Sequence, residues 1–188
     1  RYFTPGDSHP LFYLDGLPFG VTICEDIWSA DGPAATQAKE GRAALIFNLS
    51  SSPYSLGKAE EREQILRECA SENKVCIIYN NLVGGQDELV FDGCSFALNA
   101  DGTVAHRLPD WEEHLRMTHW SRTASGWACA DGPKALWEAH PADIYSAMVV
   151  GLRDYVDTNR FPGVVLGMSG GIDSALCAAI AADALGPD

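Results

Sequence analysis

The sequence has few basic residues and no long apolar run, and each absence excludes a class of function. Thirteen lysines and arginines stand against 26 aspartates and glutamates, and the formal net charge is −13. A nucleic-acid surface needs a basic patch, so we expect no nucleic-acid partner. No stretch reaches the roughly 18 apolar residues of a membrane span, so we expect no membrane partner. No secretory leader is visible either, and we expect a cytoplasmic protein.

The six cysteines lack the spacing of a metal site or a redox pair. There is no Cys-x-x-Cys pair, and no histidine stands at ligand spacing from a cysteine. Several of the cysteines lie in apolar strand-like or helix-like contexts, which suits reduced, buried thiols in a cytosolic protein. The cysteines are Cys24, Cys69, Cys76, Cys94, Cys129 and Cys177.

The first part of the chain has the alternation of strands and helices that predicts a layered α/β domain. The turn Asp15-Gly16 between two short apolar runs predicts a hairpin, and residues 84–88 read as a loop. Helices are predicted over residues 33–41 and 58–73, the second with Ile65, Leu66 and Cys69 on its inner face. Strands are predicted over residues 19–23, 43–48, 75–80, 90–91, 94–98 and 103–108.

A less regular stretch separates this domain from a second one. We expect a domain over residues 1–108, a linker over 109–141 and the start of a second domain over 142–188. The linker has little periodicity, and we interpret it as a segment that docks on a partner domain or walls a channel. The second domain begins with an amphipathic helix predicted over 142–159. The linker tryptophans are expected to be packing anchors: Trp111, Trp120, Trp127 and Trp137.

A glycine-rich turn near the carboxyl end is the most informative segment. It follows the apolar run 164–166, predicted as a strand, and precedes a small-residue helix predicted from Ala175 to Leu185. Backbone N–H groups and the positive end of a helix dipole then point at one place, which predicts an anion cradle. There is no Gly-Lys-Ser/Thr, so this is not a P-loop; an ordinary turn is the alternative.

The string Ser-Gly-Gly-x-Asp-Ser in this turn resembles the N-type ATP pyrophosphatases. The resemblance implies that ATP phosphates bind here and that Asp173 binds Mg²⁺ or orients the turn. The alternative for Asp173 is a first-turn acid that balances the helix dipole. The implied ATP-binding residues are Gly167, Met168, Ser169, Gly170, Gly171, Ile172, Asp173 and Ser174.

A second candidate site lies where the strand 19–23 ends, in the segment Val-Thr-Ile-Cys-Glu-Asp-Ile-Trp over residues 21–28. Ligands in open α/β folds bind beyond the carboxyl ends of strands, where a cysteine can be activated as a nucleophile. On spacing alone, Cys24 would count as an ordinary buried thiol. The segment, however, resembles the nucleophile strand of the nitrilase superfamily of carbon–nitrogen hydrolases. These are four-layer αββα enzymes with a glutamate base, an oxyanion-binding lysine and a cysteine nucleophile.

The two motifs in this order resemble one family, the glutamine-dependent NAD synthetases. The resemblance implies a partial nitrilase-like αββα sandwich, a linker, and the first strand–loop–helix of an adenine nucleotide α-hydrolase-like (Rossmann-like) domain. It covers essentially the whole chain. The matching segments are residues 1–6, 20–28, 48–58, 84–93, 144–156 and 161–167.

The implied activity is that of a ligase with glutamine as nitrogen donor. Glutamine is hydrolysed through a thioester on a cysteine, and ammonia passes to nicotinic acid adenine dinucleotide that ATP has adenylated, giving NAD. The expected substrates are glutamine, ATP with Mg²⁺, and nicotinic acid adenine dinucleotide. No tightly bound organic cofactor is expected, and the complete protein is expected to be a homo-oligomer.

The resemblance assigns roles to four residues around the thiol. Cys24 is the nucleophile, and Ser52 and Lys58 hold the amino-acid end of glutamine. Glu25 pairs with the substrate ammonium or positions Cys24, with a structural hydrogen-bonding role as the alternative. A turn serine and a solvated helix start are the alternatives for Ser52 and Lys58. The base and the oxyanion lysine would precede Arg1, so we expect an internal piece of a longer protein.

Three other readings remain open on the sequence. A stand-alone carbon–nitrogen amidase would need no ATP, which leaves the glycine-rich turn unexplained. Other ATP pyrophosphatase amidotransferases, such as the GMP and asparagine synthetases, have different nucleophile contexts. A binding module or scaffold that kept the fold without activity would not need Cys24, Ser52 and Lys58 together.

Overall fold

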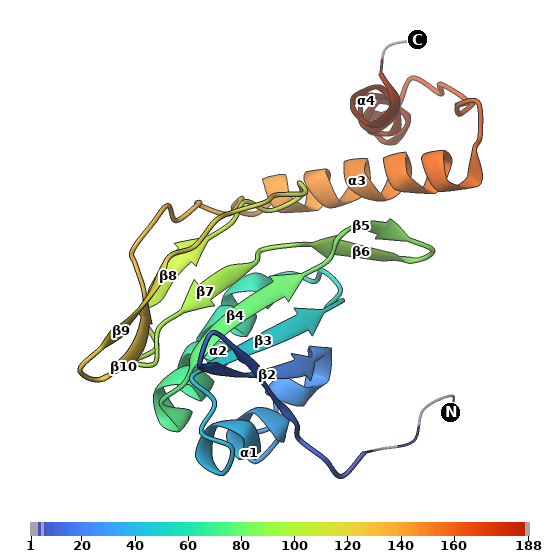
Figure 1. Ribbon diagram of the computed structural model, residues 1–188. Helices are drawn as coiled ribbons and strands as arrows, with labels where there is room; N and C mark the ends of the chain where they lie inside the picture. Colours follow the sequence, from blue (N-terminus) through green and yellow to red (C-terminus); the bar gives the residue numbers. More distant parts are fainter. Residues whose placement is uncertain (1–3, 5, 187–188) are drawn as a thin grey trace.

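A six-stranded sheet with two helices on one face forms the body of the molecule (Figure 1). The computed structural model describes residue 4 and residues 6–186, so most of the segment 1–6 used in the resemblance lies outside the described residues. The strand order is β1-β2-β3-β4-β7-β8. The strands are β1 (Leu11–Leu14), β2 (Leu17–Ile23), β3 (Leu45–Ser50), β4 (Cys76–Asn81), β7 (Phe96–Leu98) and β8 (Val104–Arg107).

The middle of the sheet is parallel, and its connections are helical. Strands β2, β3 and β4 run parallel, whereas β1, β7 and β8 pair antiparallel with their neighbours. Parallel neighbours require crossovers, which α1 (Pro33–Lys39) and α2 (Lys58–Asn73) supply. The α/β order and the closing antiparallel strands predicted from the sequence are therefore confirmed, and the bounds of α2 match the prediction.

The core lies between the sheet and these two helices. Ile46, Leu66, Ile77 and Leu98 are each fully buried there. The opposite face is apolar yet open: the side chains of Ile23 and Leu49 are 67% and 51% exposed. In an αββα sandwich this is the face on which a second sheet packs, so the described residues form part of such a sandwich.

Two segments that the sequence predicted to be irregular take part in β-hairpins in the structure. The predicted loop 84–88 is the turn region of a hairpin of β5 (Val83–Gln86) and β6 (Leu89–Asp92), in which Asp87 takes the left-handed conformation at φ 52°. The predicted linker contains the hairpin of β9 (Trp120–Thr123) and β10 (Gly126–Cys129). The sequence prediction missed these two hairpins for the same reason. Their strands contain polar residues and glycine and show no apolar alternation, so periodicity does not identify them as strands.

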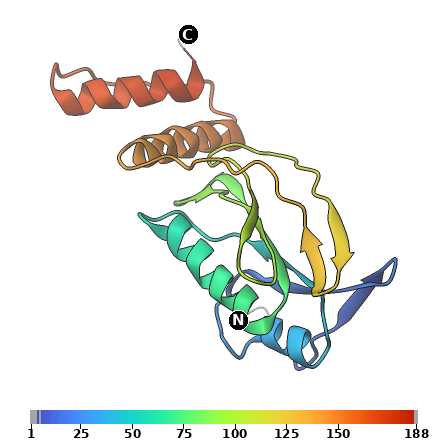
Figure 2. The ribbon, with the colours of Figure 1, turned by 90° about the vertical axis from the view of Figure 1, so that its left-hand side faces the viewer.

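Two helices end the described chain, and one predicted strand between them is wrong. Helix α3 (Ala142–Asn159) has its predicted bounds, and α4 (Ile172–Leu185) begins at Ile172 rather than at Ala175. Residues 164–166 form no strand, and Val165 is fully exposed. A strand needs a hydrogen-bonding neighbour, and no described strand lies beside this run. Helix α4 packs on α3, away from the sheet (Figures 1 and 2).

Candidate active site

Cys24 lies just beyond the carboxyl end of β2, where a short 3₁₀ helix, Cys24–Ile27, begins. Its backbone is in the left-handed region at φ 46°, and its side chain is half-buried. This conformation costs a non-glycine residue roughly 1–3 kcal/mol and tends to occur at functional sites. The strand end therefore presents the thiol at an edge of the sheet where ligands commonly bind.

A buried polar network supports the backbone of Cys24 from the neighbouring strand. Asn48 donates through Nδ2 to the Cys24 carbonyl oxygen at 3.3 Å and to Thr22 Oγ1 at 2.9 Å. Ser50 Oγ donates in turn to Asn48 Oδ1 at 2.6 Å. On the other side, the Ile23 amide donates to Asp26 Oδ2 at 2.9 Å. Sequence reasoning missed Asn48, although a polar residue at the end of an apolar strand was a usable signal.

The thiol opens into a pocket of about 420 Å³ that three segments of the chain build. The end of β2 supplies Cys24, Glu25 and Trp28, the loop after β3 supplies Ser52 and Pro53, and the start of α2 supplies Lys58. The four residues assigned to this site from the sequence, Cys24, Glu25, Ser52 and Lys58, thus line one pocket. An ammonium and a carboxylate on one wall suit a ligand that carries both charges.

Lys58 takes part in both the pocket and the helix surface. Its Nζ lies 4.2 Å from the centroid of the Trp28 ring and 2.9 Å from Glu61 Oε2. The preceding Gly57 has φ 72°, the left-handed conformation that turns the loop into α2. The aromatic face stabilises the ammonium at the pocket wall.

Arg62 holds the main chain of both Ser52 and Lys58, and sequence reasoning missed it. Its side chain is fully buried on α2 and forms an ion pair with buried Asp92. Nη1 donates to the Ser52 carbonyl oxygen at 3.4 Å, and Nε donates to the Lys58 carbonyl oxygen at 3.1 Å. The sequence feature that indicated burial of Arg62 was its spacing, because position 62 lies four residues before the buried Leu66 on the same helix face.

Asn81, the last residue of β4, completes the support of Ser52. Its Oδ1 accepts from the Ser52 amide at 2.8 Å, and its Nδ2 donates to the Ser52 carbonyl oxygen at 3.2 Å. The same Nδ2 lies 3.2 Å from Asp92 Oδ1. Ser52 itself is 6% exposed, so its position is set by groups buried around it.

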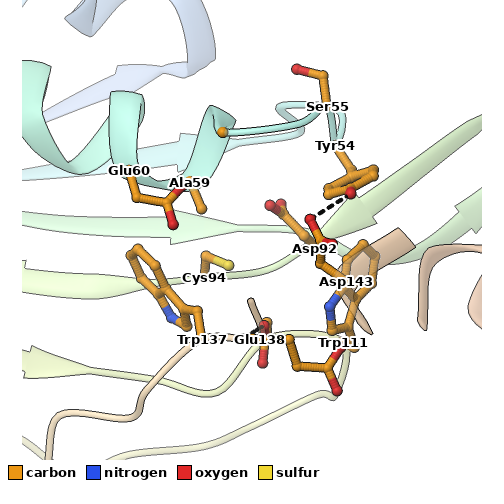
Figure 3. Close-up of a pocket in the computed structure, with 12 residues that line it drawn as sticks. Tyr54, Ser55, Ala59, Glu60, Asp92, Cys94, Trp111, Trp137, Glu138 and Asp143 are labelled. Atoms are coloured by element: carbon orange, nitrogen blue, oxygen red, sulfur yellow. Dashed lines mark hydrogen bonds between the residues drawn. The ribbon is translucent and has the colours of Figure 1, made fainter. Parts of the chain in front are cut away.

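A second, small cavity is lined in part by Tyr54 and Ser55, which follow Ser52 in the same loop (Figure 3). Its volume is about 30 Å³, and Tyr54, Asp92, Cys94, Trp111 and Asp143 are among its walls. Tyr54 donates through its hydroxyl to Asp143 Oδ2 at 2.7 Å, and its ring meets that of Trp111 edge-on at 4.9 Å. Burial, followed by the hydrogen bond to Asp143, raises the pKa of Tyr54.

Two of the four linker tryptophans, Trp111 and Trp137, confirm the expected packing role. Trp137 packs on Phe96 with ring centroids 6.4 Å apart and lies against Arg107, so it is a packing anchor like Trp111. The β9–β10 hairpin, however, contacts the amino end of β4, where Cys76 Sγ donates to the Trp127 carbonyl oxygen at 3.2 Å. Cys24 lies at the opposite end of the parallel strands, so this hairpin does not line the Cys24 pocket. The interpretation of the linker as a docking segment or a channel wall stays a prediction.

The predicted anion cradle is an open loop at the start of α4. Ser169 Oγ and Ser174 Oγ lie 3.1 Å apart, and Ser174 Oγ lies 3.0 Å from the Gly171 carbonyl oxygen. Gly170 has φ 83°, and nothing lies within 4 Å of a side chain built there. Of the eight residues predicted to bind ATP, Gly167 to Gly171 form the loop and Ile172, Asp173 and Ser174 form the first turn of the helix.

Asp173 provides one carboxylate in this first helical turn. No group of three or more His, Cys, Asp or Glu side chains that could hold a metal occurs among the described residues. Mg²⁺ commonly binds through one or two carboxylates together with nucleotide phosphates, so a lone aspartate beside the predicted anion cradle is compatible with it. Within the described chain, no helix is long and apolar enough to cross a membrane.

Two family models match the chain. The carbon–nitrogen hydrolase model matches residues 1–125, and the NAD synthase model matches residues 144–188. Among curated proteins, the glutamine-dependent NAD(+) synthetase of Acinetobacter baylyi is 44% identical over 188 residues, which is 100% of this chain and 34% of that protein. That of Rhodobacter capsulatus is 42% identical, over 99% of this chain and 33% of that protein. The chain spans about a third of the length of these relatives.

Solved structures agree with the two matches. The glutamine-dependent NAD+ synthetase from Acinetobacter baumannii, in complex with adenosine diphosphate, superposes with a TM-score of 0.90 and 42% identity. The superposition covers 99% of this chain and 35% of that one. An amidase from Nesterenkonia sp. superposes with a TM-score of 0.52 and 24% identity, over 58% of this chain and 40% of that one, and shares the fold.

Proposed function

The chain belongs to the carbon–nitrogen hydrolase family, and on this premise we propose that it cleaves the side-chain amide of glutamine and delivers the ammonia for NAD synthesis. The observation that carries the proposal is the meeting of Cys24, Glu25, Ser52 and Lys58 in one pocket. The high similarity to glutamine-dependent NAD(+) synthetases supports the choice of glutamine over other amides. The match of residues 144–188 to NAD synthase supports the fate of the ammonia.

In the first half-reaction, the sulfur of Cys24 attacks the side-chain carbonyl carbon of glutamine. The carbon–nitrogen bond breaks, ammonia leaves with a proton from the general acid–base, and a glutamyl thioester remains. Water then attacks the thioester, and glutamate leaves as the thiol regains its proton. Cys24 is the reacting group that the described chain supplies to this half-reaction.

The pocket binds the far end of the substrate. Glutamine carries an α-ammonium and an α-carboxylate, and the pocket wall carries one side chain of each charge. Lys58 pairs with the carboxylate, Glu25 pairs with the ammonium, and the Ser52 hydroxyl adds a hydrogen bond. The main chain of Ser52 is held by Asn81 and Arg62, which places its hydroxyl before the substrate arrives.

In the second half-reaction, the carboxylate of nicotinic acid adenine dinucleotide attacks the α-phosphorus of ATP, and pyrophosphate leaves. Ammonia then attacks the activated carboxyl carbon and AMP leaves, giving NAD. Backbone N–H groups of residues 167–174 bind the ATP phosphates at the start of α4. Mg²⁺ beside Asp173 would neutralise the charge of the leaving pyrophosphate. That the relative from A. baumannii was solved with adenosine diphosphate supports the binding of an adenine nucleotide by the complete protein.

The test uses the complete protein with nicotinic acid adenine dinucleotide and Mg·ATP, and with either glutamine or ammonium chloride as nitrogen source. Cys24→Ala is expected to abolish NAD formation from glutamine while NAD formation from ammonia stays within about twofold. Cys177→Ala removes an exposed thiol and is expected to change neither reaction. Glutamine-driven synthesis that survives Cys24→Ala would contradict the proposal, and glutamine hydrolysis without any NAD formation would indicate a stand-alone amidase.

A cytoplasmic location and a homo-oligomeric state belong to the same proposal. All six cysteines are free, which supports a reducing compartment.

A further inference from the structure

The loop of residues 51–57 separates two cavities. On one side, Ser52 and Pro53 line the Cys24 pocket. On the other side, Tyr54, Ser55 and Gly57 line the small cavity of Figure 3. Neighbouring residues of one loop therefore line both cavities.

Tyr54 is held from outside the six-stranded sheet. Its amide donates to the Val90 carbonyl oxygen in β6 at 2.7 Å, and its hydroxyl donates to Asp143 Oδ2 in α3 at 2.7 Å. Asp143 is 89 residues away in sequence, and its side chain is 15% exposed. A partly buried hydrogen bond to a carboxylate is one of the stronger kinds, so it fixes the ring against α3.

Helix α3 is in turn joined to the β5–β6 hairpin. The Gly85 amide donates to Asp154 Oδ2 at 2.6 Å, and a Cβ built on Gly85 would lie 3.2 Å from the Gly151 Cα. This close approach of two backbones is possible because both positions are glycine. The hairpin, Tyr54 and α3 thus form one packed unit, which Figure 1 shows with α3 lying along β5 and β6.

The same helix carries the nucleotide cradle. The loop from Arg160 to Gly171 connects α3 to α4, and α4 packs on α3. Tyr145 of α3 donates to Asp183 Oδ2 of α4 at 2.6 Å. Helix α3 therefore contacts the 51–57 loop at its beginning, through Asp143, and also packs on α4.

We propose that Tyr54 is a positioning residue, whose hydroxyl bond to Asp143 holds the 51–57 loop against α3 and so supports Ser52 together with Asn81 and Arg62. This inference rests on the proposed function, since Ser52 matters as a ligand of glutamine. Tyr54 does not line the Cys24 pocket, so it acts on the substrate only through the loop.

The first test is Tyr54→Phe in the complete protein, which removes one hydroxyl and keeps the ring on Trp111. We expect KM for glutamine to rise about tenfold, the loss expected for a hydrogen bond to a charged group, with kcat within about twofold. NAD formation from ammonia should stay unchanged. Asp143→Ala should have the same effect, and Tyr54→Phe/Asp143→Ala should be no worse than either single variant.

Tyr145→Phe is the matched control, because it removes another tyrosine–aspartate bond of α3 that does not reach the loop. Its KM for glutamine should equal that of the unaltered protein. An unchanged KM in Tyr54→Phe, or additive effects of the two changes, would overturn the inference. Either result would overturn the role of Tyr54 only. The proposed function is tested separately by Cys24→Ala, so the two failures can be told apart.

The second test does not depend on turnover. Amide hydrogen exchange over residues 51–57 should be faster in Tyr54→Phe than in the unaltered protein. Tyr145→Phe should leave this exchange unchanged. Equal exchange over residues 51–57 in Tyr54→Phe and in the unaltered protein would show that the loop is not positioned through this bond.

Discussion

Arg62 donates a hydrogen bond to the carbonyl oxygen of Ser52, with 3.4 Å between the two atoms. Its guanidinium is buried, and its charge is balanced by the buried Asp92. The same side chain reaches the Lys58 carbonyl oxygen, so one cation organises the backbone of two residues of the pocket. The loop that carries Ser52 is therefore tied to α2 from inside the core.

Breaking the buried ion pair on one side should strongly destabilise the fold. Asp92→Ala leaves the Arg62 guanidinium buried and unpaired, and we expect the free energy of unfolding to fall by about 3–5 kcal/mol. Chemical denaturation followed by circular dichroism measures this change. Asp131→Asn breaks a pair in which the aspartate side chain is 77% exposed, and its effect should stay within about 0.5 kcal/mol. Equal losses in the two variants would refute the structural role of the pair.

Asn48 should be a positioning residue for the thiol. Asn48→Ala removes the hydrogen bond to the Cys24 carbonyl oxygen, so the strained backbone of Cys24 should relax and the attack geometry should be lost. We expect kcat for glutamine hydrolysis to fall at least about tenfold, while NAD formation from ammonia is retained. Steady-state assays of glutamate release and of NAD release measure the two activities, glutamine hydrolysis and NAD formation from ammonia, separately.

Asn99 offers a control of the same kind at another cysteine. Its Oδ1 accepts from the Cys129 amide at 2.7 Å, far along the sheet from Cys24. Asn99→Ala should cost stability and leave kcat for glutamine unchanged. A drop in kcat of similar size in both variants would mean that Asn48 acts through general stability alone.

The cysteines should divide into reactive and protected sets. Burial raises the pKa of Cys76 and of Cys129 to about 11, and it also raises the pKa of Cys94. Because the thiolate is the reactive form, these three thiols should resist iodoacetamide at pH 8, whereas half-exposed Cys24 and exposed Cys177 should be labelled. Peptide mass spectrometry reads out the sites, and labelling of Cys94 as fast as Cys177 would contradict the burial.

The same raised pKa values predict a loss of stability in alkali. In the unfolded chain a cysteine has its ordinary pKa near 9.0, while folded Cys76 and Cys129 hold their protons up to a pH of about 11. Between these two values the unfolded state binds fewer protons, so the free energy of unfolding falls as pH rises. Denaturation midpoints measured from pH 8 to pH 11 should decrease, and a midpoint that rises would have the wrong sign.

Local patterns in the sequence predicted the regular elements well. The bounds of α2 and α3 and the strands around Cys24 follow from apolar periodicity, which depends on residues a few positions apart. The hairpin strands β5 and β9 were missed because polar and glycine-containing segments carry no such period. The run 164–166 was predicted as a strand because its composition is apolar, but a strand also requires a neighbour to pair with.

The sequence by itself located the two candidate sites, because a cysteine at a strand end and a glycine-rich turn before a helix are local features of the chain, and the resemblance of these segments to a family predicted their chemistry. Only the tertiary structure decided what surrounds them. It brought Ser52 and Lys58 to Cys24, placed Arg62 beneath both, and joined Tyr54 to Asp143 across 89 positions of sequence. Such contacts depend on how the sheet and its helices pack, and no short-range pattern encodes which distant side chains packing will bring together.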